Sequence, residues 1–422
     1  MTYHNAQKYI LNAPDATNDA HQGEKLRNLW SELGNPQKNI KYLRLAGSNG
    51  KTVSAEMLIS AYKNSAFRVG TLTTTLRSDL RYNIMINAEP ISFDDMAIYV
   101  EKIYKTVSCF NKNEILKEDE SKCILTLTKQ EILLSVALLA FKDHGCDFCI
   151  IESDHKHTDP TIFLPPPFSV AICGAIPSNS KNEIQMIRSY ICHGIDEIIC
   201  FPQDQEAYRI ISNTCASVNC RLTLPAKSEL SIKKFSLSGS EFSYKGIDYK
   251  IGLCGKFQIS NAIFVIELIE RLSLKGFSLS YSQIYNGLKN TKIPAKFEIL
   301  SIMPTIIADS THSDVAISAV CESMSEFQDI IGTNIRLCLP EGPLVAKYHE
   351  VLKGQGYKIQ STVLSSEKDV IDEENNFIFC KKNKDLINAI LKDLKSDEIL
   401  LISGPYSFTL KIRYELLSHM GF

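Results

Sequence analysis

The sequence has no excess of charge of either sign. Its 422 residues carry 46 Lys and Arg against 48 Asp and Glu, which gives a formal net charge of −2. A chain without a basic excess has little with which to neutralise a phosphate backbone, so nucleic acid is not an expected partner. The hydrophobic fraction of 44% is typical of a globular protein and too high for a disordered one.

Long apolar runs are also missing. The run Ile132–Phe141 has about half of the roughly 20 residues that a membrane span needs. The longest uncharged window, 160–180, contains Pro165–Pro167 and Pro177, which would break a helix. The N-terminus lacks the basic-then-apolar pattern of a signal peptide. Thirteen cysteines, scattered through apolar segments, indicate a reducing compartment. We therefore expect a soluble cytoplasmic protein that makes no contact with a membrane.

Short apolar strands alternate with helices along the chain. Tyr42–Ala46 and Arg68–Leu72 read as strands, separated by a glycine-rich turn and a helix at Val53–Lys63, which is the βαβ pattern of a parallel sheet. Further strands are expected at Asp147–Ile151, Ser169–Cys173, Glu197–Phe201, Thr305–Asp309, Asn334–Leu339, Lys358–Leu364, Phe377–Cys380 and Glu398–Ser403, short antiparallel strands within Ile232–Leu253, and helices at Ala20–Leu33, Thr128–Phe141 and Ser260–Leu272. The pattern restarts near Pro294. We predict an α/β protein with a central parallel-sheet domain over residues 1–293 and a smaller α/β domain over residues 294–422.

The turn after the first strand has the composition of a phosphate loop, Gly47-Ser48-Asn49-Gly50-Lys51-Thr52. A turn of this kind aims backbone N–H groups at one point, and the helix N-terminus adds partial positive charge there. Lys51 would reach the terminal phosphates of a nucleotide, and Thr52 offers a hydroxyl near Mg²⁺. Leu45 stands where the general pattern has a further glycine, so the loop is a shortened form. A chance Gly-Lys-Thr turn is the alternative, which the strand–loop–helix context disfavours.

The shortened loop resembles that of the Mur ligase superfamily, and its surroundings are similar to folylpolyglutamate synthases. The similar segments follow the family order from about residue 25 to residue 410: Leu33–Gln37, Leu45–Lys51, Ile86–Ser92, Thr128–Glu131, Gly255–Asn261, Ile293–Glu298, Asp309–His312 and Leu400–Gly404. Each segment is weak alone, but the ordered set is specific. The resemblance implies an ATP-binding central domain of Mur ligase type, a Rossmann-like C-terminal domain, and ATP held between them.

The implied reaction joins an amino acid, glutamate in the folate-type members, to a carboxylate through an acyl phosphate. The resemblance thus implies ATP and Mg²⁺, small-molecule carboxylate and amino-acid substrates, and a monomer. Phosphoryl transfer of this kind depends mainly on positioning and on neutralising charge.

The resemblance also implies roles for single residues. The catalytic set would be Lys51, which holds the phosphates, Glu152 and Arg188. The expected Mg²⁺ ligands are the oxygen donors that this cation prefers: Thr52, Thr74 in place of a family serine, Glu152 and Asn179. The expected nucleotide contacts are the residues of the phosphate loop, Asn261 and His312 at the adenine, Asp309 at the ribose, and Lys296 in place of an arginine at the phosphates.

The chain departs from the family at four places. After Glu152 the family has a glycine-rich turn, whereas Ser153–Thr161 is one residue shorter and has no glycine. Asn179 stands near the place of a metal-binding histidine, and Arg188 at that of a lysine that becomes carbamylated, which an arginine cannot do. Arg81–Ile84 replaces an Asn-Glu-Arg-Ile segment. Two hypotheses therefore stay open: a divergent ligase, and a nucleotide-binding homologue without catalytic activity.

Two further clusters have competing interpretations. His155 and His157, flanked by acidic residues, could hold a transition metal or stand near the phosphates, but a solvated loop is the simpler interpretation. Cys146-x-x-Cys149 lies in an apolar segment without a second cysteine pair, so we interpret it as core packing.

Overall fold

The structure is a computed structural model of the chain. It describes residues 1–16, 21–38, 40–47, 49–74, 76–77, 79–115, 124–153, 159–176, 181–191, 194–311, 313–366, 370–372, 376–392 and 394–420. Two compact units are present: Met1–Ala226 with Ile263–Gly287, and Lys227–Ala262 with Leu288–Phe422. The domain boundary that the sequence places between residues 293 and 294 stays a prediction.

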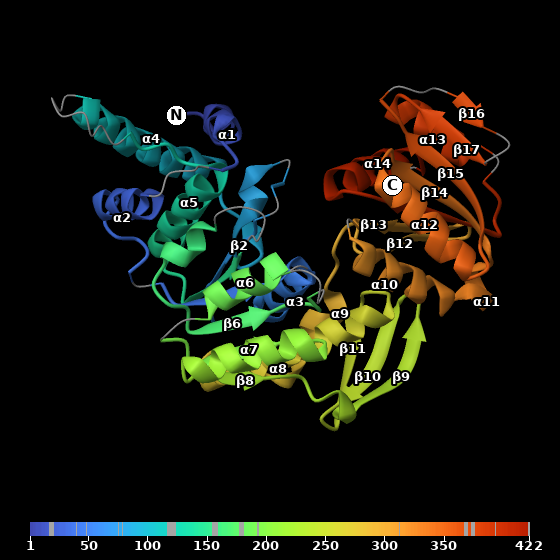
Figure 1. Cartoon of the computed structure of the whole chain (residues 1–422), viewed down its shortest axis with the longest axis horizontal. Helices are drawn as coiled ribbons and strands as arrows, with labels where there is room; N and C mark the ends of the chain where they lie inside the picture. Colours follow the sequence, from blue (N-terminus) through green and yellow to red (C-terminus); the bar gives the residue numbers. More distant parts are fainter. Residues whose placement is uncertain are drawn as a thin grey trace. The chain divides into compact units, whose positions relative to one another are not determined.

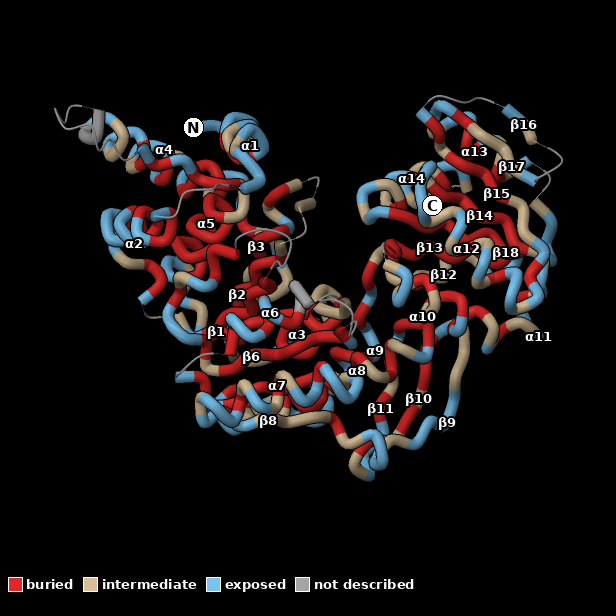
Figure 2. The backbone as a smooth tube through the Cα atoms, viewed as in Figure 1, coloured by how far each residue is buried: buried red, intermediate tan, exposed pale blue. Residues whose placement is uncertain are grey.

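The first unit is built on an eight-stranded sheet in the order β4-β3-β2-β5-β1-β6-β7-β8. The strands are β1 (Tyr42–Ala46), β2 (Val69–Leu72), β3 (Ile84–Ile86), β4 (Glu89–Pro90), β5 (Phe148–Glu152), β6 (Ser169–Ile172), β7 (Glu197–Cys200) and β8 (Arg221–Thr223). The run from β2 to β8 is parallel, and β3 and β4 add an antiparallel edge. The central strands are buried along their whole length, which explains their continuous apolar sequences (Figure 2).

Helices cover both faces of this sheet (Figure 1). One face carries α3 (Lys51–Tyr62) and the part of α8 (Lys256–Leu274) that belongs to this unit, and α9 (Tyr281–Asn290) packs against α3 through Gly287. The other face carries α2 (Gln22–Glu32), α5 (Lys129–Asp143), α6 (Lys181–Tyr190) and α7 (Gln205–Ser217), and α1 (Tyr3–Asn12) and α4 (Phe93–Ile115) pack on α5. Two short 3₁₀ turns, η1 (Leu80–Asn83) and η2 (Pro160–Phe163), lie in the connections.

Helix α5 contains the apolar run that is too short to span a membrane, and this run is part of the core. Thr128 and Glu131 form a capping box, in which the Glu131 N–H donates to Thr128 Oγ1 over 3.2 Å and the Thr128 N–H donates to Glu131 Oε2 over 2.8 Å. The run Ile132–Phe141 that follows is buried on every side in the core of the first unit. Within the part of the chain that the structure describes, no helix is both long and apolar enough to cross a bilayer.

The second unit contains two sheets. The larger has the order β12-β13-β18-β14-β15-β17-β16, with β12 and β16 as antiparallel edges of a parallel centre. Its strands are β12 (Glu298–Ile302), β13 (Thr305–Asp309), β14 (Asn334–Pro340), β15 (Lys358–Leu364), β16 (Val370–Asp372), β17 (Phe377–Cys380) and β18 (Glu398–Ser403). Helices α10 (Asp314–Ser325) and α12 (Pro343–Gly354) pack with one hydrophobic cluster, and α13 (Asn383–Leu391) and α14 (Tyr406–Met420) with another; α11 (Gln328–Ile331) is a single turn.

The smaller sheet of the second unit is an antiparallel meander of β9 (Leu230–Ser236), β10 (Gly239–Tyr244) and β11 (Ile247–Ile251), preceded by η3 (Lys227–Glu229). Lys245 and Gly246 join β10 to β11 with φ values of 51° and 75°, the left-handed pair of a two-residue hairpin turn. Both units are α/β, so the predicted fold class is confirmed.

Candidate functional site

The phosphate loop follows the central strand β1, which lies between β5 and β6, and it leads directly into α3 at Lys51. Gly47 has φ 112° and Gly50 has φ 77°, in the left-handed region that favours glycine. A Cβ atom at Gly47 would lie 2.2 Å from the carbonyl oxygen of Cys173. The backbones of Gly47 and Cys173 are therefore in direct contact, and no residue larger than glycine fits at position 47. Ser48 lies outside the described residues.

The side chain of Lys51 lies over its own loop, where Nζ donates to the carbonyl oxygen of Gly47. The first turn of α3 begins at the same place, and the N–H groups of a first helical turn have no partners within the helix. A cation and free N–H groups at one loop are the elements of an anion-binding site.

We predict that Gly47→Ala lowers the free energy of unfolding by roughly 3 kcal/mol, because a strained φ adds to a backbone clash. Gly145→Ala is the matched control, since Gly145 has φ 62° but open space around its Cβ position. Its expected loss is about 1 kcal/mol. Urea unfolding followed by the fluorescence of Trp30, the chain's single tryptophan, measures both. Equal losses would show that the close approach at Cys173 is absent.

A buried carboxylate stands beside the loop. Glu152 is the last residue of β5, it pairs in register with Leu45 of β1, and it is 1% exposed. The Thr74 N–H donates to its Oε2 over 3.4 Å, whereas its Oε1 has no hydrogen-bond partner among the described residues. Burial raises the pKa of Glu152, and the charge of Lys51, the Thr74 N–H and the Thr52 hydroxyl act against that rise. The structure thus brings together four of the expected site residues: Lys51, Thr52, Thr74 and Glu152.

These residues fit a magnesium ion. An orphaned carboxylate oxygen and the hydroxyls of Thr52 and Thr74 are hard oxygen ligands, and Mg²⁺ usually takes one or two carboxylates and completes its shell with water and phosphate. No group of three or more His, Cys, Asp or Glu side chains that could hold a metal occurs in the described ranges. The expected ligand Asn179, like His155 and His157, lies outside those ranges.

Two charged residues near Glu152 were not predicted. Glu56 lies one turn after Thr52 on α3, and its Oε1 is 3.7 Å from Nη2 of Arg77. Burial raises the pKa of Glu56, Arg77 opposes the rise, and the negative charge of Glu152 adds to it. Arg77 also opposes the rise in the pKa of Glu152. The i,i+4 spacing from Thr52 could have indicated Glu56, but nothing local indicates Arg77.

A third unpredicted residue holds the segment beside the loop. The Nε2 of Gln203 donates to the carbonyl oxygen of Gly174 over 2.9 Å, and its Oε1 accepts from the Ile176 N–H over 2.8 Å. A Cβ atom at Gly174 would lie 2.6 Å from the carbonyl oxygen of Asn49. Gln203 therefore fixes the backbone against which the phosphate loop packs.

Arg188 does not join this group. It lies on α6 with an exposed side chain, and within the described residues it makes no hydrogen bond or ion pair to Lys51 or Glu152. Its assignment as a catalytic residue stays a prediction.

The expected nucleotide contacts of the second unit lie on different elements. Asp309, at the end of β13, accepts from the Phe297 N–H over 2.8 Å and from the Thr311 hydroxyl. Burial raises the pKa of Asp309, and the nearby charge of Lys296 opposes the rise. Asn261 lies on α8, where its Nδ2 donates to Oε1 of the buried Gln258 over 3.0 Å. His312 lies outside the described residues.

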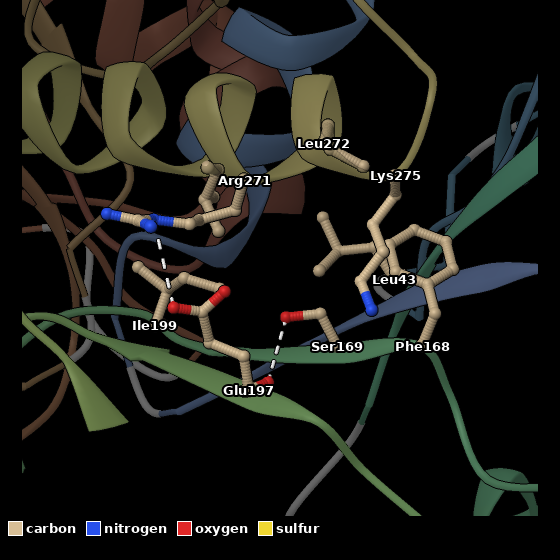
Figure 3. Close-up of a pocket in the computed structure, with 9 residues that line it drawn as sticks. Leu43, Phe168, Ser169, Glu197, Ile199, Arg271, Leu272 and Lys275 are labelled. Atoms are coloured by element: carbon tan, nitrogen blue, oxygen red, sulfur yellow. Dashed lines mark hydrogen bonds and ion pairs between the residues drawn. The ribbon is translucent and has the colours of Figure 1, made fainter. Parts of the chain in front are cut away.

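A small hollow, with about 240 Å³ of empty space when open solvent is included, lies near the start of β6 and β7, at the ends of these strands away from the phosphate loop (Figure 3). Its polar groups already have partners. Glu197 accepts from Thr223 Oγ1 over 2.6 Å and lies 3.7 Å from Nε of Arg271, and Lys275 pairs with Asp196. The hollow is too small for most ligands and is separate from the phosphate loop.

Comparisons with known proteins find relatives along most of the chain. No protein-family model matches the chain. Over 93% of its length it is 23% identical to a dihydrofolate synthase/folylpolyglutamate synthase of Bacillus subtilis, of which it covers 94%. Over 72% of its length it is 22% identical to a probable bifunctional folylpolyglutamate synthase/dihydropteroate synthase of Haloferax volcanii, of which it spans 36%.

Solved structures share the fold over nearly the whole chain. The apo form of L. casei FPGS matches with a TM-score of 0.81 and 18% identity, over 99% of this chain and 100% of that one. An FPGS–AMPPCP–folate complex matches with a TM-score of 0.80, at the same identity and coverage. The two-unit α/β fold, the shortened phosphate loop and the relatives matched along the chain lead to one conclusion: the chain is similar to the folylpolyglutamate synthases, which supports its membership of the superfamily that they form with the Mur ligases.

Proposed function

We propose that the chain is an ATP-dependent amide ligase of the folate type, which joins an amino acid, glutamate, to a carboxylate substrate. The observation that carries the proposal is the buried Glu152 with an orphaned oxygen beside Lys51 of the phosphate loop. The relatives named as folylpolyglutamate and dihydrofolate synthases, and the related fold of an FPGS–AMPPCP–folate complex, support the choice of ATP and a folate.

The proposed reaction has two steps. The substrate carboxylate attacks the γ-phosphorus of ATP, the bond to the ADP oxygen breaks, and an acyl phosphate forms. The amino group of glutamate then attacks the acyl carbon, loses a proton, and displaces inorganic phosphate to leave the amide. Lys51 neutralises charge that develops on the phosphates, and the N-terminus of α3 orients them through its N–H groups.

Thr52, Thr74 and Glu152 would hold Mg²⁺ at this place. The bound ion supplies positive charge at the phosphates. Glu152 suits this role because its Oε1 has no hydrogen-bond partner among the described residues, and a cation would satisfy that buried oxygen. The nucleotide contacts of Asn261, Lys296, Asp309 and His312 are part of the proposal, as are a monomeric state and a cytoplasmic location.

Phosphate release from ATP tests the proposal. We expect the purified protein with Mg²⁺ to release phosphate several times faster when dihydropteroate or folate is present together with glutamate than when either is omitted. Mass spectrometry should detect the glutamylated product. Binding of AMPPCP without turnover under all these conditions would contradict the ligase and support the nucleotide-binding homologue without catalysis.

A further inference from the structure

A buried polar network joins β1, the segment after Glu152, and the end of α6. Its members, Arg44, Ser153, Asp159, Thr161 and Tyr190, are each between 1% and 4% exposed. They lie on the sheet face that α5 and α6 cover, and none of them belongs to the phosphate loop. Buried polar groups of this number are unusual in an apolar core and call for a physical reason.

Arg44 is the centre of the network. Its Nη2 donates to the carbonyl oxygen of Thr161 over 2.6 Å, and its guanidinium lies 4.9 Å from the ring centroid of Tyr190. The side-chain oxygens of Thr161 and Ser153 are 3.0 Å apart. Ser153 also donates its N–H to the carbonyl oxygen of Leu45 over 2.9 Å. The residue directly after Glu152 is therefore fixed to β1 through its backbone and to Thr161, the partner of Arg44, through its side chain.

Asp159 closes the network on the other side. Its Oδ2 accepts from the Tyr190 hydroxyl over 2.6 Å, and its Oδ1 accepts from the Thr161 N–H over 2.9 Å. Burial, and then the charge of Asp159, raises the pKa of Tyr190, so the phenol remains a donor over the physiological range. Each end of the Ser153–Thr161 segment thus has a buried anchor.

Stability alone does not account for Arg44. No carboxylate oxygen lies within ion-pair distance of its guanidinium among the described residues, and its Nε has no hydrogen-bond partner there. Desolvation of such a cation is costly, and an apolar side chain of similar volume is often at least as stable. The guanidinium is better explained by the arrangement that it imposes on its partners.

We propose that Arg44, Asp159 and Tyr190 are positioning residues, which hold Glu152 at the distance from Lys51 that Mg²⁺–nucleotide binding requires. The inference rests on the proposed function. The network anchors the segment in which the chain lacks the glycine-rich turn of the family it resembles. It acts on Glu152 through Ser153, and it does not touch the nucleotide or the metal.

Tyr190→Phe tests the proposal with the smallest change, because it removes the hydroxyl and keeps the ring under Arg44. Calorimetric titration of AMPPCP into the full chain measures the affinity for AMPPCP at a series of Mg²⁺ concentrations. The readout is the Mg²⁺ concentration at which this affinity reaches half of its maximum. We expect Tyr190→Phe and Asp159→Asn each to raise this concentration about 10-fold, as loss of a residue behind a metal ligand usually does. Arg44→Lys, which keeps the charge, should restore part of the loss seen in Arg44→Met.

The control is Tyr208→Phe, at an exposed tyrosine of α7. It should leave the Mg²⁺ dependence unchanged. A Tyr190→Phe protein that melts at a lower temperature but keeps the wild-type Mg²⁺ dependence would overturn the proposal, since a purely structural role predicts that result. Failure of the wild-type protein to bind AMPPCP with Mg²⁺ would instead refute the proposed function, and the positioning role with it.

Discussion

Replacement of Lys51 by methionine is expected to lower the rate of ATP-dependent phosphate release by about 10²- to 10³-fold. The ammonium of Lys51 donates a hydrogen bond to the carbonyl oxygen of Gly47 within the loop. A small movement would therefore bring it into contact with a phosphate bound there. Methionine has a similar length and no charge, and it leaves φ at Gly47 and Gly50 unaffected. The loss should therefore appear in kcat and in AMPPCP affinity, with little change in the melting temperature.

Lys63→Met is the matched control for this variant. Lys63 is the residue directly after α3, and its side chain is 53% exposed in an ion pair with Glu89. An exposed pair of this kind contributes little to stability, so activity and melting temperature should both stay close to those of the wild type. Phosphate release by Lys51→Met at the wild-type rate would show that the loop is not the phosphate site.

The phosphate loop could be predicted because several local signals coincide within a few residues. The apolar run Tyr42–Ala46, the glycines that follow it and the helix after Lys51 each indicate the same turn. The place of Glu152 follows from one more step, since a buried strand that ends in a carboxylate must present it at the edge where the parallel neighbour ends. The structure brings both together through the register of β1 and β5.

Other parts of the site depend on contacts between distant segments. Gln203 holds Gly174, and Arg77 reaches Glu56, although no pattern around either residue indicates such a partner. Arg44 lies within an apolar strand, and the alternation of side chains along that strand gives no sign that Arg44 has a special role. Such side chains acquire a role only through the fold, which explains why the sequence indicated the loop and the carboxylate but missed the residues that hold them.

Glu152→Gln should raise the stability of the protein in the absence of Mg²⁺. Burial raises the pKa of Glu152, so the folded state binds its proton more tightly than the unfolded state does. The stability linked to this proton is present below the unfolded pKa of about 4.3 and is lost as the pH rises through the folded pKa. At pH 7 the glutamine avoids the cost of a buried charge, and we expect a gain of about 1 kcal/mol in the free energy of unfolding.

The same substitution should strongly reduce the stabilisation by Mg²⁺, which distinguishes a metal ligand from an acid that is only buried. Mg²⁺ with AMPPCP should stabilise the wild type by about 2.7 kcal/mol at 100 times the dissociation constant, whereas Glu152→Gln should gain much less. Glu206→Gln, at an exposed residue of α7, should respond as the wild type does. Thermal unfolding with and without Mg²⁺ measures both effects. If Glu152 serves only the fold, its replacement by glutamine would change the stability without Mg²⁺ but not the stabilisation by Mg²⁺. An unaltered stabilisation by Mg²⁺ in Glu152→Gln would therefore show that Glu152 is not a metal ligand.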